Sequence, residues 1–68
     1  MIPVKSSNLA AVGYDTSSQT LRVEFLTPSL YEYDGVPSHV HQGLMNAASH
    51  GSYFAANIRD KYTFRQLK

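Results

Sequence analysis

Apolar and polar residues alternate most clearly over residues 21–25. Leu21, Val23 and Phe25 are separated by the charged residues Arg22 and Glu24. This two-residue period is typical of a strand that buries one face and exposes the other. The sequence therefore predicts a half-buried strand here, with its charged side chains on the solvated face.

Two further strands are predicted, one on either side of this segment. Residues 8–14 are mostly apolar, and residues 15–19 are rich in turn formers, so residues 8–25 are expected to form a hairpin. Residues 30–33 form the third strand, which ends at the turn signal Asp34-Gly35. Pro28 lies in the turn before it, because proline cannot donate a ladder hydrogen bond. Short connections favour an antiparallel meander.

After Pro37, the apolar residues recur at the spacing of an α-helix. Val40 and Leu44 recur at helical spacing, and either Pro37 or Ser38 suits the start of the helix. Gly43 costs such a helix about 1 kcal/mol relative to alanine. We expect its missing side chain to allow a close approach to the sheet.

A second helix is predicted after a break at residues 49–51. Ser52 can cap it, and Phe54, Ile58 and Tyr62 then share one face. Residues 64–68 either fray or add a short strand. The predicted fold class is α+β, with a three-stranded antiparallel β-meander followed by two short helices packed on one face. Residues 1–68 are expected to form a single domain.

Composition supports a folded, cytoplasmic protein. Hydrophobic residues make up 43% of the chain and charged residues 16%, which is too apolar for a disordered protein. The chain has no cysteine, which excludes disulfides and thiolate metal sites and fits a reducing compartment. No apolar run approaches the roughly 20 residues that span a bilayer, so no membrane partner is expected.

The charge distribution argues against avid, nonspecific nucleic-acid binding. The net charge is only +1, whereas such binding usually needs a basic surface. Near the C-terminus, however, four basic residues accompany a single acid, Asp60: Arg59, Lys61, Arg65 and Lys68. This segment is interpreted either as a solvated helix end and tail or as a small phosphate-contacting patch.

The three histidines do not have the spacing of a metal site. His39 and His41 are two residues apart, so on a helix they point about 200° from each other. Zinc-binding pairs on helices are three or four residues apart. His50 has no cysteine or carboxylate close to it in the sequence. We expect all three histidines to face solvent and the protein to hold no metal or cofactor.

The acidic residues of the predicted sheet are the remaining candidates for catalysis. Glu32 and Asp34 share a strand face, and Glu24 can lie beside them on the neighbouring strand. Such a group could transfer protons, but the same pattern is also typical of an exposed sheet face. No glycine-rich phosphate loop or nucleophile motif accompanies it. We therefore expect a protein that is not an enzyme.

Tyrosines are the most informative residues of the chain, and two of them, Tyr31 and Tyr33, project from one face of a strand. If that face packs under the helices, both belong to the core, with their hydroxyl groups at its rim. If it is open, they form a platform that stacks on bases or contacts a protein. The acids on the opposite face favour packing beside residues 21, 23 and 25.

Nine short motifs carry a family resemblance over residues 4–62. They are Ser6-Ser7-Asn8, Gly13-Tyr14-Asp15, Leu21-x-Val23-x-Phe25, Tyr31-Glu32-Tyr33, Val36-Pro37, Leu44, Ala48-Ser49-His50-Gly51-Ser52-Tyr53-Phe54, Ile58-Arg59 and Tyr62. Together they resemble the KTSC domain, a small bacterial and phage domain named for its occurrence at the C-terminus of some lysyl-tRNA synthetases. The chain departs from the family at residues 27–29, where a glycine is usual, and at His41, where an aromatic residue is frequent.

Two functions follow from these patterns and from the resemblance, which implies a stand-alone copy of the domain. The favoured one is a non-catalytic module that binds another protein, or itself as a homodimer, for example as a small bacterial or phage inhibitor or adaptor. The sheet edges could add a strand from such a partner. The alternative, suggested by the synthetase context, is an RNA-binding or other nucleic-acid-binding module. Its candidate residues are Tyr14, Tyr31 and Tyr33 for stacking on bases and Arg22, Arg59, Lys61 and Arg65 for contacting phosphate.

Overall fold

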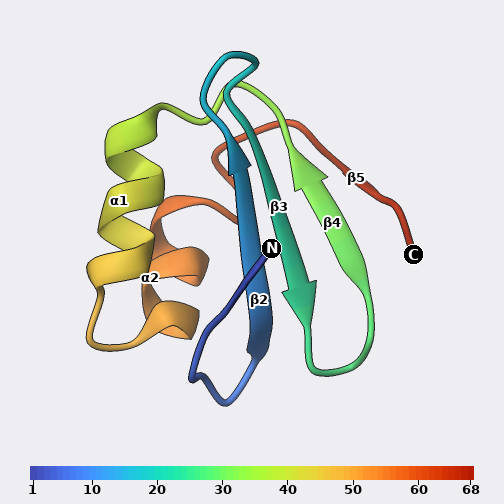
Figure 1. The fold of residues 1–68 in the computed structure, drawn as a ribbon, viewed down its shortest axis with the longest axis vertical. Coiled ribbons are helices and arrows are strands. Elements are labelled where there is room, and N and C mark those ends of the chain that lie inside the picture. The colour runs from blue at the N-terminus through green and yellow to red at the C-terminus, as the bar shows by residue number, and fades with distance from the viewer.

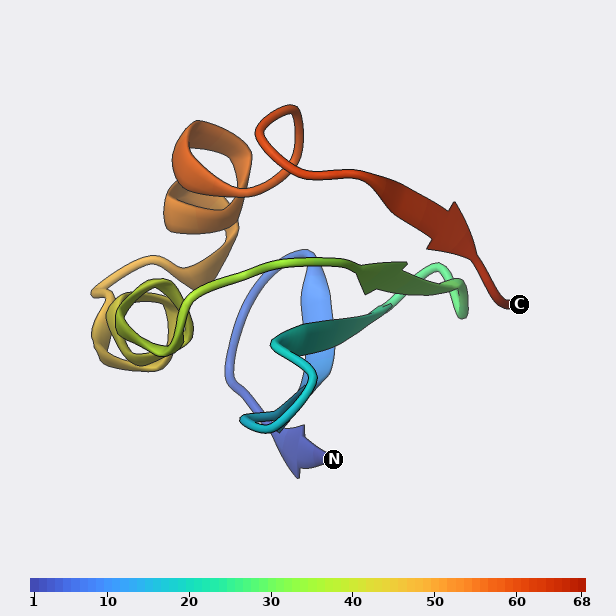
Figure 2. The same cartoon turned by 90° about the horizontal axis from the view of Figure 1, so that it is seen from above.

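The computed structural model describes residues 1–68 as one five-stranded antiparallel sheet with two helices. The elements are β1 (Ile2–Pro3), β2 (Leu9–Asp15), β3 (Thr20–Phe25), β4 (Leu30–Tyr33), α1 (Ser38–Asn46), α2 (His50–Asn57) and β5 (Phe64–Gln66). The strands lie in the order β1-β2-β3-β4-β5, and both helices lie on the same side of the sheet (Figures 1 and 2). The predicted α+β class and the central meander are confirmed.

The sheet has five strands and not the predicted three, because a further short strand lies at each edge. At one edge, Ile2 pairs with Val12. At the other, the chain returns from α2 and places β5 beside β4 (Figure 2), and Glu32 pairs with Arg65. Two or three residues are too few to show a period in the sequence. Of the two alternatives for residues 64–68, the short strand is correct.

A β-bulge in β2 sets which residues face the core. Leu9 pairs with Phe25 and Ala11 pairs with Glu24, so the strand contains one extra residue between these pairs. Leu9 and Val12 are three residues apart yet both are 1% exposed and belong to the same core cluster. The bulge therefore lets this strand bury residues that simple alternation would place on opposite faces.

The core lies between the sheet and the two helices. Leu21 and Val23 of β3 are fully buried, as the alternation predicted. Leu44 of α1 and Ile58, the C-cap residue of α2, are also fully buried and belong to the same cluster. Neither helix has the length and apolar character that crossing a bilayer requires.

The second helix begins earlier than the sequence suggested. Ser49 is its N-cap, and the Ser49 hydroxyl oxygen accepts a hydrogen bond from the Ser52 backbone N–H at 3.2 Å. The prediction of Ser52 as the cap was therefore wrong, because His50 and Gly51 form the first turn rather than a break. The helix ends at Asn57, so Tyr62 lies beyond it and not on its face.

Gly43 allows a close approach, but to the second helix and not to the sheet. A Cβ atom at this position would lie 2.6 Å from Cζ of Tyr53, which projects from α2. The Tyr53 ring thus occupies the space that a side chain on α1 would need. The prediction of contact with the sheet was wrong.

Two of the three histidines are only partly exposed and make contacts within the chain, contrary to the prediction. The His41 ring stacks on Tyr14 of β2, with centroids 4.5 Å apart and planes 9° from parallel. The His50 ring contacts the Leu44 carbonyl oxygen through Nδ1 at 2.8 Å, whereas His39 is exposed. At position 41 the imidazole therefore packs within the chain, and burial lowers the pKa of His41.

We predict that Gly43→Ala destabilises the protein by about 1–3 kcal/mol, because the new methyl group overlaps the Tyr53 ring. In a Tyr53→Ser background the space is free, and the same change should stabilise the helix by about 1 kcal/mol. Denaturant unfolding of the four proteins in this double-mutant cycle measures the reversal. If Gly43→Ala has the same effect in both backgrounds, the contact does not control the packing of the helices.

We predict that the stability of the protein falls as the pH falls through 6.5, the ordinary pKa of histidine. The lowered pKa of folded His41 means that the unfolded chain binds more protons between that pKa and 6.5, so this stability is lost across the interval. His41→Tyr keeps an aromatic ring on Tyr14 and should remove this dependence. His39→Tyr is the control, because His39 is exposed on the same helix. Thermal unfolding across this pH range would refute the account if the two variants behave alike.

Candidate functional site

The side chains of β4 point to two different faces of the sheet. Tyr31 pairs with Val23 and Tyr33 pairs with Leu21, so both tyrosines lie on the face that carries the core. Glu32 lies between them and points to the opposite face. The side chains of one four-residue strand therefore form part of an aromatic groove on one face and the centre of an ion-pair network on the other.

The aromatic groove lies between the sheet and α2, with a volume of about 590 Å³. Five aromatic side chains line it: Phe25, Tyr31, Tyr33, Phe54 and Phe64. The rings of Phe25, Tyr33 and Phe54 meet edge to face, with centroids 5.3 Å apart for Phe25–Phe54 and 5.5 Å apart for Tyr33–Phe54. Such edge-to-face contacts fix the orientation of the rings.

Tyr33 belongs to the floor of this groove. It is 3% exposed, and burial raises the pKa of its hydroxyl to about 12. Tyr31 is only partly exposed, with its ring against Phe25 and Phe64. The prediction of an open tyrosine platform is therefore wrong for Tyr33, and the packed alternative is correct.

Exposed apolar residues form the rim of the groove. Phe64 of β5 is 51% exposed, although one side of its ring lies against Tyr33 with centroids 5.5 Å apart. Leu26, which follows β3, is 56% exposed. The only charged residues that line the groove are Arg59 and Asp60, which form a loose ion pair at 3.8 Å. The residues that line the groove therefore carry no net charge, and eight of the fifteen are hydrophobic.

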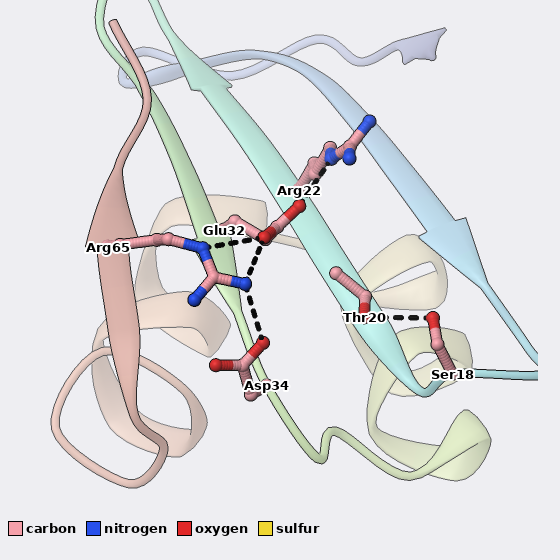
Figure 3. A network of polar contacts seen from close by, with 6 residues as sticks. All are labelled: Ser18, Thr20, Arg22, Glu32, Asp34 and Arg65. Carbon is pink, nitrogen blue, oxygen red and sulfur yellow. Dashed lines mark hydrogen bonds and ion pairs between the residues drawn. The ribbon is translucent and has the colours of Figure 1, made fainter.

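The opposite face is organised around Glu32. Arg22 of β3 donates through Nε to one carboxylate oxygen at 2.7 Å. Arg65 of β5 reaches the other oxygen through Nε at 2.9 Å and Nη2 at 2.6 Å, and it lies 3.5 Å from Asp34 (Figure 3). The Glu32 side chain is only 8% exposed, although no helix covers this face. One carboxylate thus links three neighbouring strands.

These contacts decide the charge state of Glu32. Hydrogen bonds from Arg22, and then from Arg65, hold the pKa of the Glu32 carboxyl below its usual value of 4.5. The hydrogen bond with Glu32 in turn raises the pKa of Arg65. Glu32 and Asp34 share a face, as predicted, but Glu32 is a charged hydrogen-bond acceptor and not an exposed residue.

The structure does not bring the seven predicted binding residues together. Tyr14 donates a hydrogen bond to the Val36 carbonyl oxygen at 2.5 Å and stacks on His41, so its ring is already occupied. Arg22 and Arg65 lie on the polar face, away from Tyr31 and Tyr33. Arg59 lines the groove, and Lys61 is exposed in the segment after it.

Sequence reasoning missed most of the groove. Phe25 and Phe54 were expected only as apolar packing residues, and Phe64 only as part of a segment that frays or forms a short strand. These residues lie far apart in the chain, and only the pairing of β5 with β4 places Phe64 beside the tyrosines. The structure brings no three histidine or acidic side chains into a group that could hold a metal ion.

We predict that Glu32→Gln lowers the midpoint of thermal unfolding by several degrees at neutral pH, because both arginines lose their charged acceptor. The contribution of Glu32 is complete above pH 4.5 and is lost as the pH falls through its lowered folded pKa, so the two proteins should converge in acid. Glu24→Gln is the control, because Glu24 lies on the same face without an ion pair. An equal loss in both variants would contradict the central role of Glu32.

Comparison with known proteins places this fold in a family. Residues 5–62 match the KTSC domain. An uncharacterized protein of Stutzerimonas stutzeri is 43% identical over 53 residues, which cover 78% of this chain and 75% of that protein. A lysine–tRNA ligase of Nostoc punctiforme is 37% identical over 67 residues, which cover 98% of this chain and 12% of the ligase. The chain therefore corresponds to a small part of the ligase.

A solved structure agrees with the fold described above. The crystal structure of a KTSC domain protein from Yersinia pestis has a TM-score of 0.94 and 36% sequence identity with this chain. The similarity covers 97% of this chain and 93% of the other. The resemblance inferred from the short motifs is confirmed, and the chain belongs to the KTSC domain family.

Proposed function

We propose that this domain is a non-catalytic binding module that holds an apolar segment of another protein in its aromatic groove. The observation that carries the proposal is the groove itself, which has a volume of about 590 Å³ and five aromatic side chains in its lining. Phe64 and Leu26 leave more than half of their surface exposed at its rim. Aromatic residues at a concave, apolar surface are typical of the energetic centre of protein interfaces.

The charges around the groove favour a protein over a nucleic acid. Arg59 and Asp60 carry opposite charges, so the residues that line the groove have no net charge. Arg22 and Arg65 bind Glu32 on the opposite face, and neither lines the groove. Binding of a nucleic-acid backbone depends on several free cations in one surface. Similar sequences occur within lysine–tRNA ligases, so the test below also measures the binding of RNA.

The preference of Glu32 for its charged form supports a non-catalytic function. A general base must accept a proton near the working pH, and a general acid must hold one. The two arginines lower the pKa of Glu32, which favours its charged form and makes it a weak proton acceptor. Glu32 is therefore better suited to a structural role than to proton transfer.

Ala55 and Ala56 provide a matched test of the groove. Ala55 lines the groove, whereas its neighbour Ala56 on α2 is exposed and lies outside the lining. Peptides are first selected on the domain from a displayed library of random short sequences. Ala55→Gln should weaken their binding about tenfold or more, because the longer side chain fills the groove. Ala56→Gln should leave the affinity unchanged.

The same assay includes mixed short RNA and DNA oligonucleotides at low salt. The proposal expects no saturable binding of either. It is refuted if the library yields no binding peptide, or if Ala55→Gln has no effect on those it yields. Oligonucleotide binding that weakens as salt rises would instead support the RNA-binding alternative.

A further inference from the structure

Strand β5 has an open outer edge. The sheet order ends at β5, and all three of its residues are exposed. The other edge of the sheet is β1, which has only two residues, one of them Pro3. Proline and short length both hinder the addition of a further strand. The β5 edge is thus the place where this sheet can be extended.

The pairing with β4 shows which backbone groups of β5 point outward. The Asp34 N–H donates to the Thr63 carbonyl oxygen at 2.9 Å, and the Leu67 N–H donates to the Leu30 carbonyl oxygen at 2.7 Å. Hydrogen-bonded pairs alternate along an antiparallel ladder, so the Glu32–Arg65 pair between these two also turns its backbone groups inward. The N–H and carbonyl groups on either side of Arg65 therefore point away from the sheet.

These outward groups belong to Phe64 and Gln66, whose side chains lie on the face of the groove. Phe64 lies against Tyr33, and Gln66 pairs with Tyr31. A strand bound to this edge would place its residues opposite Phe64 and Gln66 on the same face, at the apolar rim. The residue between them would point to the other face, beside Arg65.

The charge along this edge selects the partner. Lys61, Arg65 and Lys68 lie in or beside β5, and no acidic residue follows Asp60. Arg65 is 59% exposed although it contacts Glu32. In a symmetric antiparallel pair of two copies joined through these outward groups, the two Arg65 side chains would lie directly opposite each other, which is unfavourable. The edge therefore disfavours a second copy and favours a strand with an acidic residue at that position.

We infer that the groove's partner is an extended segment of another protein that adds to β5 as a sixth strand, in an apolar–acidic–apolar pattern. This inference rests on the proposed function, because it names the conformation and chemistry of the segment that the groove holds. The backbone of the segment bonds to the outward groups of Phe64 and Gln66. Its apolar residues contact the exposed half of Phe64, and its acidic residue lies beside Arg65.

Gln66→Pro tests the inference, since proline removes one outward N–H and leaves the inward ladder to β4 intact. Its binding of the selected peptides should weaken about tenfold or more, whereas Gln66→Thr, which keeps the N–H, should bind like the parent protein. Replacing the acidic residue of a selected peptide by lysine should also weaken binding. Amide hydrogen exchange, which needs no variant, should show that Phe64 and Gln66 become protected when peptide is added.

The outcomes separate this inference from the proposed function. Peptides that lose affinity with Ala55→Gln but not with Gln66→Pro would support the groove and overturn strand addition. Selected peptides without an acidic residue would overturn the proposed charge pattern. A dimer in solution that Gln66→Pro converts to a monomer would show that a second copy occupies the edge, which also contradicts the inference.

Discussion

Glu32 accepts hydrogen bonds from arginines on both neighbouring strands, and the arrangement of the outer sheet depends on this one carboxylate. Arg22 approaches it from β3 and Arg65 from β5, with atoms 2.6–2.9 Å apart. β5 has only three residues, all exposed, so little burial holds it in place. A charged acceptor shared by two guanidinium groups fixes the register of such a short strand more firmly than its backbone hydrogen bonds alone.

The position of β5 then determines the surface on the other face. Because side chains alternate along a strand, placing Arg65 opposite Glu32 places Phe64 opposite Tyr33. Phe64 completes the aromatic groove, and the outer edge of the same strand stays open. The polar network, the groove and the open edge are therefore consequences of one pairing between β4 and β5.

The sequence predicted the local features of this fold well. Alternation identified β3 and the face that carries Leu21 and Val23, turn signals marked the ends of β4, and helical spacing identified both helices. The features that depend on distant residues could not be predicted. Residues 22, 32 and 65 meet only after the sheet has formed, and nothing local shows that Arg65 is bound to an acid. The bulge in β2 also has no clear local signal.

Some predictions failed because a short-range preference was overridden by packing. Residues 50 and 51 were interpreted as a helix break, yet they form the first turn of α2 once Ser49 caps it. His41 was expected to face solvent, yet it stacks on Tyr14. The candidate binding residues were chosen by type, and the structure divides them between two faces. Only Tyr31, Tyr33 and Arg59 of that set line the groove.

Residue-resolved amide hydrogen exchange of the free protein tests most directly whether β5 is held on the sheet with an open edge. We expect slow exchange at Arg65, whose N–H points toward Glu32 on β4, and fast exchange at Phe64 and Gln66, whose N–H groups point to solvent. Exchange at Arg65 as fast as at its two neighbours would contradict it, because β5 would then not be paired with β4.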